Sequence, residues 1–262
     1  GTDEHGQKVE KSALAAGIAP QEFTDNVSKS FLELTNKLEI HNDDFIRTTE
    51  LRHKKAVESL WQKLEDTGDI YLDKYSGWYS IRDEAFYSSD EVVKNSNGKN
   101  VASNGSEVEW VEEPSYFFKL SAWQDKLLKF YKDNPDFISP KSRYNEVLSF
   151  VNKGLEDLSI SRTTFKWGIP VPSNENHIIY VWLDALTNYL SGVDYPNTNS
   201  KKWKKYWPAN IHVVGKDILR FHAIYWPAFL MAANIELPKK IYAHGWWTVN
   251  GEKMSKSTGN VI

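Results

Sequence analysis

The sequence NIHVVGKDI, residues 210–218, joins an unbroken apolar run to a glycine turn. Two further runs have the same character, HIIYV at residues 177–181 and KIYA at residues 240–243. The runs at 210–214 and 177–181 lead directly into helical patterns. Apolar strands that lack alternation and precede helices are typical of a buried parallel sheet. We therefore predict an α/β fold with a doubly wound parallel sheet in the last third of the chain.

The amino-acid composition excludes several classes of protein. The chain has 262 residues, of which 40% are hydrophobic, and its 11 Trp, 13 Tyr and 12 Phe exclude a disordered chain. It has no Cys, which excludes a disulfide framework, a thiolate nucleophile and a zinc site built on Cys. The net charge of −3 does not indicate a protein that coats nucleic acid. No apolar run approaches the roughly 18 residues that span a bilayer, so we expect no membrane partner and a cytosolic compartment, in a bacterium or an organelle matrix.

The patterns before residue 173 alternate between helix and hairpin. Apolar spacings of three and four predict helices at residues 23–38, with Thr24 as N-cap, and at residues 56–64, ended by Gly68. The other expected elements are strands at 70–72 and 78–81 around a turn at 74–77, a loop or loose hairpin at 94–106, a returning strand at 108–111, and helices at 120–131 and 147–151.

Residues 252–260 read EKMSKSTGN and carry the sharpest chemical signal. They follow an expected hairpin at residues 247–252, whose Asn-Gly pair favours a tight turn. Two lysines, small hydroxyls and a glycine offer charges and donors to phosphate oxygens. An exposed basic surface loop is the alternative for any two lysines, but the complete string Lys-Met-Ser-Lys-Ser is the signature loop of class I aminoacyl-tRNA synthetases.

A second cluster opens at the glycine turn of residues 215–217. In doubly wound sheets, ligands lie at the carboxyl ends of strands, and a helix N-terminus there favours phosphate. Ile218, His222 and Trp226 follow at spacings of four and share one helical stripe. The alternative is a packed core stripe with one satisfied histidine. The same alternative applies to a second set with helical spacing, which is Trp182, Ala185 and Tyr189.

Taken together, these strings closely resemble the methionyl-tRNA synthetases, a family of class I aminoacyl-tRNA synthetases. The matching segments, in order along essentially the whole chain, are GTDEHGQK at 1–8, LSISR at 158–162, YVWLDA at 180–185, GKDILRFH at 215–222, HGWW at 244–247 and the signature loop. The resemblance implies a Rossmann-like nucleotide-binding fold, a doubly wound parallel sheet split by a mixed α+β connective insertion. The implied domains are residues 1–68 as part of the catalytic domain, 69–172 as the insertion, and 173–262 as the second half of the catalytic domain.

The activity implied is amino-acid activation. L-Methionine and ATP with Mg²⁺ form methionyl-adenylate and pyrophosphate, and methionine then passes to the 3′-terminal adenosine of tRNA(Met). Both steps depend on positioning and on neutralising charge at phosphate. The resemblance assigns phosphate-binding lysines to catalysis, namely Lys216, Lys253 and Lys256. It assigns the ATP site to Gly215, Asp217, His244, Gly245, Trp247, Ser255 and Ser257.

The resemblance also implies a methionine site. Asp3 is expected to accept the substrate ammonium group, and a thioether makes favourable contacts with aromatic edges. The expected side-chain pocket comprises Trp182, Ala185, Leu186, Tyr189, Ile218 and His222, with Arg162 and Trp226 behind it. Some family members carry Pro where Leu186 stands.

The chain departs from the family in two places. It lacks a His-Ile-Gly-His-like string and the anticodon-binding domain, so we expect it to begin inside the catalytic domain and to be inactive alone. Residues 94–106 hold two Asn-Gly pairs where many relatives carry Cys pairs, so we expect no structural zinc.

Alternative functions remain open at this stage. A synthetase for isoleucine, valine or leucine needs a larger editing insertion than the roughly one hundred residues here. A noncatalytic RNA-binding or scaffold protein is the other alternative. The basic patch KKWKKYW at 201–207 offers contacts to a tRNA acceptor stem, but a solvated loop with Trp203 and Trp207 packed inward is favoured. We expect a monomer or a weak dimer.

Overall fold

The computed structural model describes residues 1–262 except 84, 88, 96 and 255–262. The chain divides into two compact units. The first unit comprises Gly1–Lys119 and Asp157–Trp203, and the second comprises Leu120–Glu156 and Lys204–Ile262. The domain boundaries drawn from the sequence stay a prediction.

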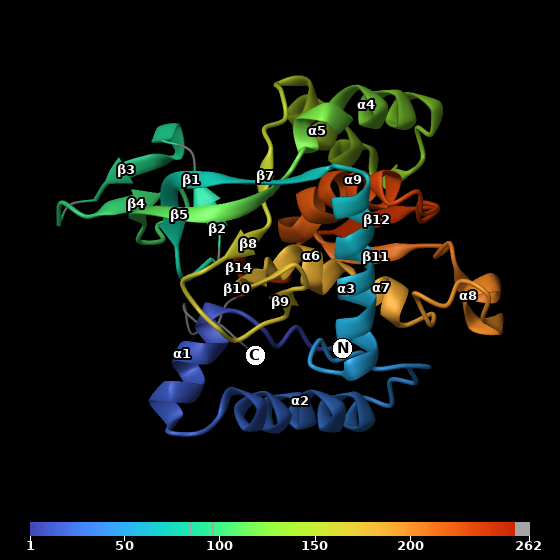
Figure 1. Cartoon of the computed structure of the whole chain (residues 1–262), viewed down its shortest axis with the longest axis horizontal. Helices are drawn as coiled ribbons and strands as arrows, with labels where there is room; N and C mark the ends of the chain where they lie inside the picture. Colours follow the sequence, from blue (N-terminus) through green and yellow to red (C-terminus); the bar gives the residue numbers. More distant parts are fainter. Residues whose placement is uncertain (84, 88, 96, 255–262) are drawn as a thin grey trace. The chain divides into compact units, whose positions relative to one another are not determined.

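The first unit contains helices at its start and end and antiparallel strands between them (Figure 1). Its helices are α1 (Gln7–Ala16), α2 (Pro20–Lys37), α3 (Leu51–Asp66), η1 (Ser89–Glu91), α6 (Val181–Leu186) and α7 (Asn188–Ser191). Its strands are β1 (Ile70–Ser80), β2 (Ala85–Tyr87), β3 (Val92–Lys94), β4 (Asn100–Ala102), β5 (Glu109–Phe118), β7 (Leu158–Ser159), β8 (Ser161–Arg162), β9 (Pro170–Val171) and β10 (Asn174–Ile179).

The second unit carries the parallel sheet. Its helices are η2 (Leu120–Trp123), α4 (Gln124–Asp133), α5 (Lys141–Asn152), η3 (Lys216–Ile218), the π-helix η4 (Phe221–Tyr225) and α9 (Trp226–Ala232). Its strands are β6 (Ile138–Ser139), β11 (His212–Gly215), β12 (Ile241–His244), β13 (Thr248–Val249) and β14 (Glu252–Lys253). A further helix, α8 (Lys201–Tyr206), runs across the division between the units.

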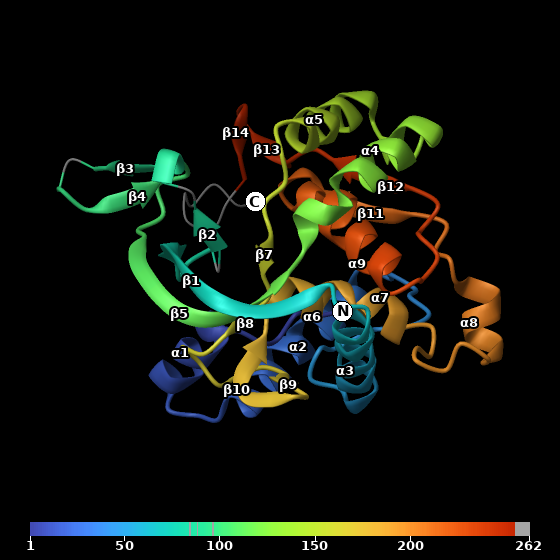
Figure 2. The same cartoon turned by 45° about the horizontal axis from the view of Figure 1, so that its top comes forward.

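The longest sheet is built on one antiparallel ladder between β1 and β5, which Figure 2 shows as a long curved ribbon. The order of its strands is β2-β1-β5-β7. The expected turn at residues 74–77 was wrong, because the ladder continues through it from Lys74 opposite Pro114 to Gly77 opposite Val111. Two short strand signals separated by turn residues are therefore one strand, whose pairing with β5 overrides the local turn preference. The expected hairpin at 94–106 is confirmed by β3 and β4.

Helix α3 supplies much of the core of the first unit. Ala56, Leu60, Trp61 and Leu64 are fully buried, as their spacing predicts, and Gly68 adopts a φ of 73° just after the helix. The ring of Trp61 meets that of Tyr116 edge-on at 5.5 Å. The helix thereby anchors the β1–β5 ladder.

Helix α2 is confirmed, but it begins earlier than its expected cap. Its N-cap is Ala19, with Pro20 as the first helical residue, and Thr24 lies inside the helix. The hydroxyl of Thr24 donates to the carbonyls of Pro20 and Gln21, at 3.1 and 2.9 Å, instead of capping free N–H groups. Proline at the first position removes a donor that a cap would otherwise satisfy.

The parallel sheet of the second unit has the order β11-β12-β6. Both predicted strands, at 210–214 and 240–243, are present and pair in parallel, and β6 is a third that the sequence did not indicate. The run at 177–181 behaves differently, because β10 pairs antiparallel with β8 and β9. In the described part of the chain, the expected parallel pairing of this run is therefore wrong. An apolar run indicates that both faces of a strand are buried, but it does not indicate the direction of the neighbouring strands.

Candidate functional site

The nucleotide-binding residues expected in the second unit lie at one edge of its sheet. Gly215, the last residue of β11, pairs with His244, the last residue of β12. Because the strands are parallel, the residues that follow them leave from the same edge, which Figure 1 shows beside α9. The structure therefore brings Lys216 and Asp217 to the same edge as His244 and Gly245.

Direct contacts link the two turns at this edge. The indole Nε1 of Trp246 donates to Oδ2 of Asp217 at 2.5 Å, and Nζ of Lys216 lies 3.3 Å from the centre of the Trp246 ring. His244 Nδ1 lies 2.8 Å from the carbonyl oxygen of Gly245. A cation, a carboxylate and an indole face at the end of a parallel sheet are groups that bind phosphate, ribose and a planar base.

Trp246 was not among the residues expected to bind ATP, although its neighbour Trp247 was. Trp246 is 44% exposed and Trp247 is 77% exposed. The HGWW string gave no reason to prefer one indole to the other, since only the path of the chain after β12 decides which of them faces Lys216.

The expected hairpin before the signature loop is confirmed. β13 pairs with β14, and Asn250 and Gly251 form the turn with φ values of 52° and 83°. Two successive positive φ angles are those of the tight turn that an Asn-Gly pair favours. The backbone of Lys253 lies in β14. Ser255, Lys256 and Ser257 lie outside the described residues.

The stripe of Ile218, His222 and Trp226 runs along the helical segment after Lys216. Trp226 is fully buried, His222 is 3% exposed and Ile218 is half-buried. His222 Nδ1 lies 2.9 Å from the carbonyl oxygen of Ile218, and burial lowers the pKa of His222. Burial, together with the nearby His222, lowers the pKa of His212 to about 3. This burial favours the packed-core interpretation for Trp226, while Ile218 retains access to solvent.

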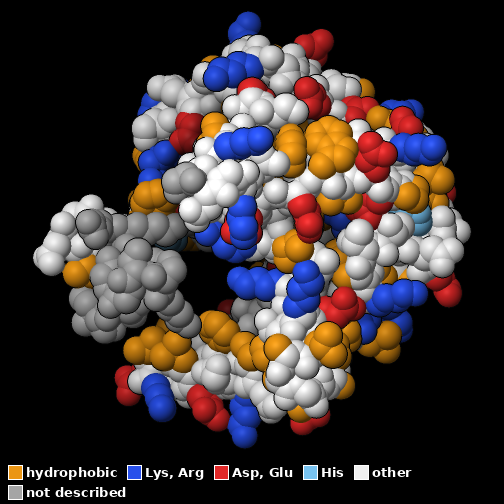
Figure 3. All heavy atoms as spheres, turned by 90° about the vertical axis from the view of Figure 1, so that its left-hand side faces the viewer, with side chains coloured by type: hydrophobic (Ala, Val, Ile, Leu, Met, Phe, Trp, Pro, Cys, Tyr) orange, Lys and Arg blue, Asp and Glu red, His pale blue; other side chains and the backbone are white. Residues whose placement is uncertain are grey.

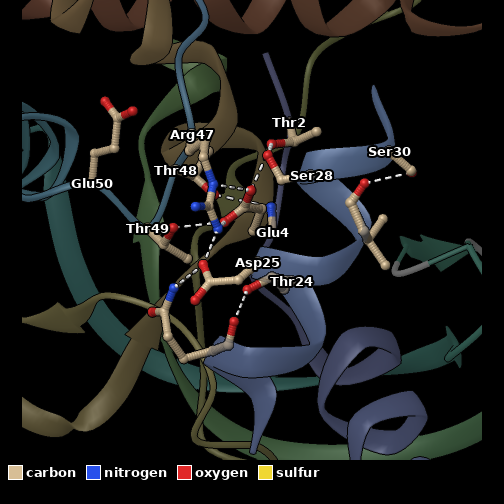
Figure 4. Close-up of polar contacts among 12 residues, drawn as sticks. Thr2, Glu4, Thr24, Asp25, Ser28, Ser30, Arg47, Thr48, Thr49 and Glu50 are labelled. Carbon is tan, nitrogen blue, oxygen red and sulfur yellow. Dashed lines mark hydrogen bonds and ion pairs between the residues drawn. The ribbon is translucent and has the colours of Figure 1, made fainter. Parts of the chain in front are cut away.

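Asp3, in the first unit, is an exposed residue between Thr2 and Glu4, whose side chains are held by hydrogen bonds. Glu4 is 3% exposed and accepts a bidentate ion pair from Arg47, with Nε–Oε1 and Nη2–Oε2 distances of 2.7 and 3.0 Å (Figure 4). The Thr2 and Thr49 hydroxyls also donate to Glu4, each at 2.6 Å. Burial opposes ionisation, but these partners outweigh it and lower the pKa of Glu4.

A pocket of about 220 Å³ adjoins this segment, with Asp3 in its lining. Its apolar wall comes from α1 and α2, namely Val9, Phe23, Val27 and Phe31. Along α2, Val27, Phe31 and Leu34 are between 41% and 49% exposed, and Leu38, the C-cap residue, is 60% exposed. Figure 3 shows hydrophobic side chains gathered on the lower part of the face, where Figure 1 places α1 and α2.

The expected methionine-pocket residues of the first unit sit on α6 and α7. Trp182, Ala185 and Tyr189 share the half-buried face of these helices. Leu186 is 1% exposed and lies on the buried side. Burial raises the pKa of Tyr189 to about 12, so its hydroxyl remains protonated. The helical pattern that follows the run at residues 177–181 is interrupted at Thr187.

Arg162, expected behind the pocket, is a buried cation. It is 2% exposed, its guanidinium carbon lies 4.4 Å from the centre of the Tyr180 ring, and Nη1 donates to Ser159 Oγ at 2.8 Å. The ring and the hydroxyl fix Arg162 directly beside the segment that enters α6.

The basic patch at 201–207 forms the short helix α8 followed by Trp207. Trp203 lies 5.6 Å from the ring of Tyr195. Trp207 is 7% exposed and donates to the carbonyl oxygen of Glu236 at 3.0 Å. Both tryptophans therefore pack against the chain, as the favoured interpretation requires, although the lysines sit on a helix instead of a loop.

Sequence reasoning missed three residues of the first unit, which are His5, His53 and Asp184. They form a buried hydrogen-bonded cluster, with Asp184 between the two imidazoles. No local pattern linked these three residues to one another, because they are 48 or more positions apart in sequence. No three His, Asp or Glu side chains in the described part of the chain are placed to hold a metal ion. None of the described helices is long and apolar enough to cross a membrane.

Comparison with known proteins gives the family. A profile of the tRNA synthetases class I (M) matches residues 1–262. The methionine–tRNA ligase of Rickettsia felis is 64% identical over 262 residues, which are the whole of this chain and 50% of that protein. The methionine–tRNA ligase of Brucella suis is 56% identical, again over the whole chain and 51% of its own length. The chain thus spans about half the length of these relatives.

A solved structure agrees with the sequence relatives. The crystal structure of Mycobacterium tuberculosis methionyl-tRNA synthetase bound by methionyl-adenylate superposes with a TM-score of 0.96 at 52% identity, covering 100% of this chain and 52% of that one. The class I synthetase fold expected from the sequence is therefore confirmed. With its sheet-edge cluster of lysine, aspartate and indole and a profile match over its full length, the chain belongs to the class I tRNA synthetase family (M).

Proposed function

We propose that the protein containing this chain is a methionine–tRNA ligase. It activates L-methionine with ATP and Mg²⁺ to methionyl-adenylate, releases pyrophosphate, and transfers methionine to the 3′-terminal adenosine of tRNA(Met). The observation that carries the proposal is the contact between Lys216, Trp246 and Asp217 at the carboxyl edge of β11 and β12. The similarity of this chain to a synthetase crystallised with methionyl-adenylate supports methionine as the substrate.

The nucleotide chemistry requires charge neutralisation at phosphate. We assign Lys216, Lys253 and Lys256 to the triphosphate, because developing charge on phosphate oxygens is stabilised by positioned cations. Asp217 is oriented by the Trp246 N–H and is assigned to the ribose hydroxyls. Mg²⁺ enters with ATP as its phosphate-bound partner.

The methionine chemistry requires an ammonium acceptor and an apolar pocket. Asp3 is an exposed carboxylate on a backbone whose next residue is held by Arg47. Trp182, Ala185 and Tyr189 are assigned to the side chain, since a thioether packs favourably against aromatic edges. We propose that the protein works in the cytosol of a bacterium or in an organelle matrix.

The test is methionine-dependent exchange between ATP and labelled pyrophosphate in the whole protein. Methionine should support exchange, and isoleucine, valine and leucine should not. Lys256→Ala should reduce exchange at least about 100-fold, as expected for loss of a group that stabilises transition-state charge. Lys29→Ala, an exposed lysine on α2, is the matched control and should leave exchange unchanged. Absence of exchange with all four amino acids in folded protein would favour the noncatalytic RNA-binding or scaffold alternative.

A further inference from the structure

Asp184 is an ionised residue in the interior of the first unit. It lies on α6 between Trp182 and Ala185 and is fully buried. Its Oδ2 is 2.6 Å from Nδ1 of His5, and its Oδ1 is 2.7 Å from Nε2 of His53. Burial alone would raise the pKa of Asp184, but the two imidazoles lower it below its usual value. The carboxylate therefore accepts one hydrogen bond from each of two distant segments.

Each imidazole is held by a second contact. Nδ1 of His53, on α3, lies 2.9 Å from the hydroxyl of Ser191 on α7. The ring of His5 meets that of Trp167 at 5.5 Å, and Nε1 of Trp167 donates to the carbonyl oxygen of Glu4 at 2.6 Å. The cluster thereby joins the segment at residues 1–6 to α3, α6 and α7.

Stability is a poor explanation for a charge in this place. Removing a carboxylate from water is unfavourable, and well-packed apolar side chains of similar volume hold helices together as well or better. The position of the cluster explains it more directly, because His5 stands two residues from Asp3 and Asp184 stands on α6 with Trp182 and Ala185.

His5 is two residues from Asp3, in a segment that precedes the first helix. Asp184 stands in the same helical turn as Trp182 and Ala185, but on the buried side, so those two occupy the half-buried face. The 2.6 Å bond between His5 and Asp184 is therefore the link between the backbone that presents the ammonium acceptor and the helix that presents the side-chain pocket.

We propose that Asp184 is a positioning residue that fixes the separation between Asp3 and the methionine pocket on α6. The inference rests on the proposed function. A misplacement of about 1 Å between groups that bind one substrate costs up to about 100-fold in rate. The hydrogen-bonded pair of His5 and Asp184, here called the clamp, also sets the length of the substrate that fits between Asp3 and the pocket. Its loss should therefore weaken discrimination against ethionine, which is one methylene longer than methionine.

The variants follow from the hydrogen bonds. Asp184→Asn keeps the shape but removes the charge and turns one acceptor into an NH₂ donor, so the imidazole that faces it must change tautomer or lose its hydrogen bond. His5→Ala removes the imidazole from the hydrogen bond between His5 and Asp184. His5→Asn is the conservative variant, because the Asn amide nitrogen occupies the place of Nδ1 and restores a donor to Asp184. Thr187→Val is the control, since Thr187 is fully buried and its hydroxyl donates to the Leu183 carbonyl at 2.7 Å, whereas its bond with Ser191 uses the backbone carbonyl that valine keeps.

Pyrophosphate exchange in the whole protein gives the readouts. Asp184→Asn and His5→Ala should raise KM for methionine about 10- to 100-fold while KM for ATP stays within about twofold. The ratio of kcat/KM for methionine to that for ethionine should fall about fivefold or more, because one methylene is worth about 10- to 200-fold in a well-fixed pocket. His5→Asn should return KM for methionine to within about threefold of the wild type. Thr187→Val should behave as the wild type.

The outcomes separate the clamp from the proposed function. If the wild type shows no methionine-dependent exchange, the proposed function fails. If the wild type is active but Asp184→Asn and His5→Ala keep its KM and its selectivity, or lose activity toward both substrates equally, the clamp is overturned and the cluster is structural. If Asp184→Asn does not fold, the comparison of His5→Ala with His5→Asn decides, because rescue of KM by the amide is expected only of a positioning bond.

Discussion

The ammonium group of Lys216 lies 3.3 Å from the centre of the Trp246 ring, whose N–H is held at 2.5 Å by Asp217. One indole thus orients a cation with its face and a carboxylate with its edge. Because the indole is 44% exposed, ligand can reach both groups.

We expect Trp246→Leu to weaken ATP binding. Both Lys216 and Asp217 lose the ring that orients them, and a cation–π contact of about 0.5–2 kcal/mol corresponds to a rise of about 2- to 30-fold in KM for ATP. Pyrophosphate exchange at varied ATP measures it. Trp110→Leu, a half-exposed tryptophan on β5, is the matched control and should leave KM for ATP unchanged. Equal effects of the two substitutions would argue against an orienting role for Trp246.

The buried Glu4 carboxylate should make Arg47 important for stability. Arg47→Met leaves Glu4, which is 3% exposed, without its bidentate partner, and an unpaired buried charge costs about 3–5 kcal/mol. Arg52→Met removes exposed ion pairs with Asp44 and Glu50 and should cost less than about 1 kcal/mol. Urea unfolding of the whole protein measures both losses. A loss below about 1 kcal/mol for Arg47→Met would mean that Glu4 finds other partners or becomes protonated.

The buried His212 should make folding sensitive to acid. Its pKa is about 3 in the folded protein and 6.5 in the unfolded chain, so the unfolded chain takes up the proton first as the pH falls. The stabilisation is therefore complete above about pH 6.5 and is lost between pH 6.5 and 3, at up to about 1.4 kcal/mol for each pH unit.

His212→Leu should remove this dependence. Urea unfolding at several pH values from 7.5 downward should give a shallower fall in the free energy of unfolding than in the wild type, by about 1.4 kcal/mol for each pH unit below 6. His41→Leu changes an exposed histidine and should retain the wild-type slope. An unchanged slope in His212→Leu would assign the acid sensitivity to other groups.

The turn of the β13–β14 hairpin should matter for activity more than for stability. Gly251 has a φ of 83°, where a side chain costs about 1–2 kcal/mol, and the hairpin leads into the signature loop. Gly251→Ala should lower the rate of pyrophosphate exchange about 5- to 30-fold with little change in the thermal midpoint. Gly98→Ala makes the same change at a φ of 75° in the β3–β4 hairpin and should leave exchange unaffected. Equal exchange rates for the two variants would separate the hairpin from catalysis.

Local patterns were sufficient for much of the fold. Apolar spacing along α3 gave the buried face of Ala56, Leu60 and Leu64, and the Asn250-Gly251 pair gave the β13–β14 turn. Both follow from backbone and side-chain geometry within a few residues. The unbroken run of β11 and the turn at Gly215 also placed Lys216 and Asp217 correctly at the edge of a parallel sheet.

Pairing partners required the tertiary structure. The direction of β10 and the continuity of β1 through residues 74–77 depend on hydrogen bonds to strands far along the chain, which local preference does not encode. The exposed apolar stripe of α2 shows the same limit, since periodicity identifies a helix and its apolar face but not what covers that face.

The sequence by itself determined the family and the chemical inventory, because the strings around Lys216, His244 and the signature loop are contiguous and need no fold to be recognised. Only the tertiary structure decided that Trp246, and not Trp247, meets Lys216, and that His5 and His53 converge on Asp184. The physical reason is that a hydrogen bond acts over about 3 Å in space, whereas its partners here stand 179 and 131 residues apart. Folding brings such groups together through the packing of whole helices and strands, and no local pattern marks them beforehand.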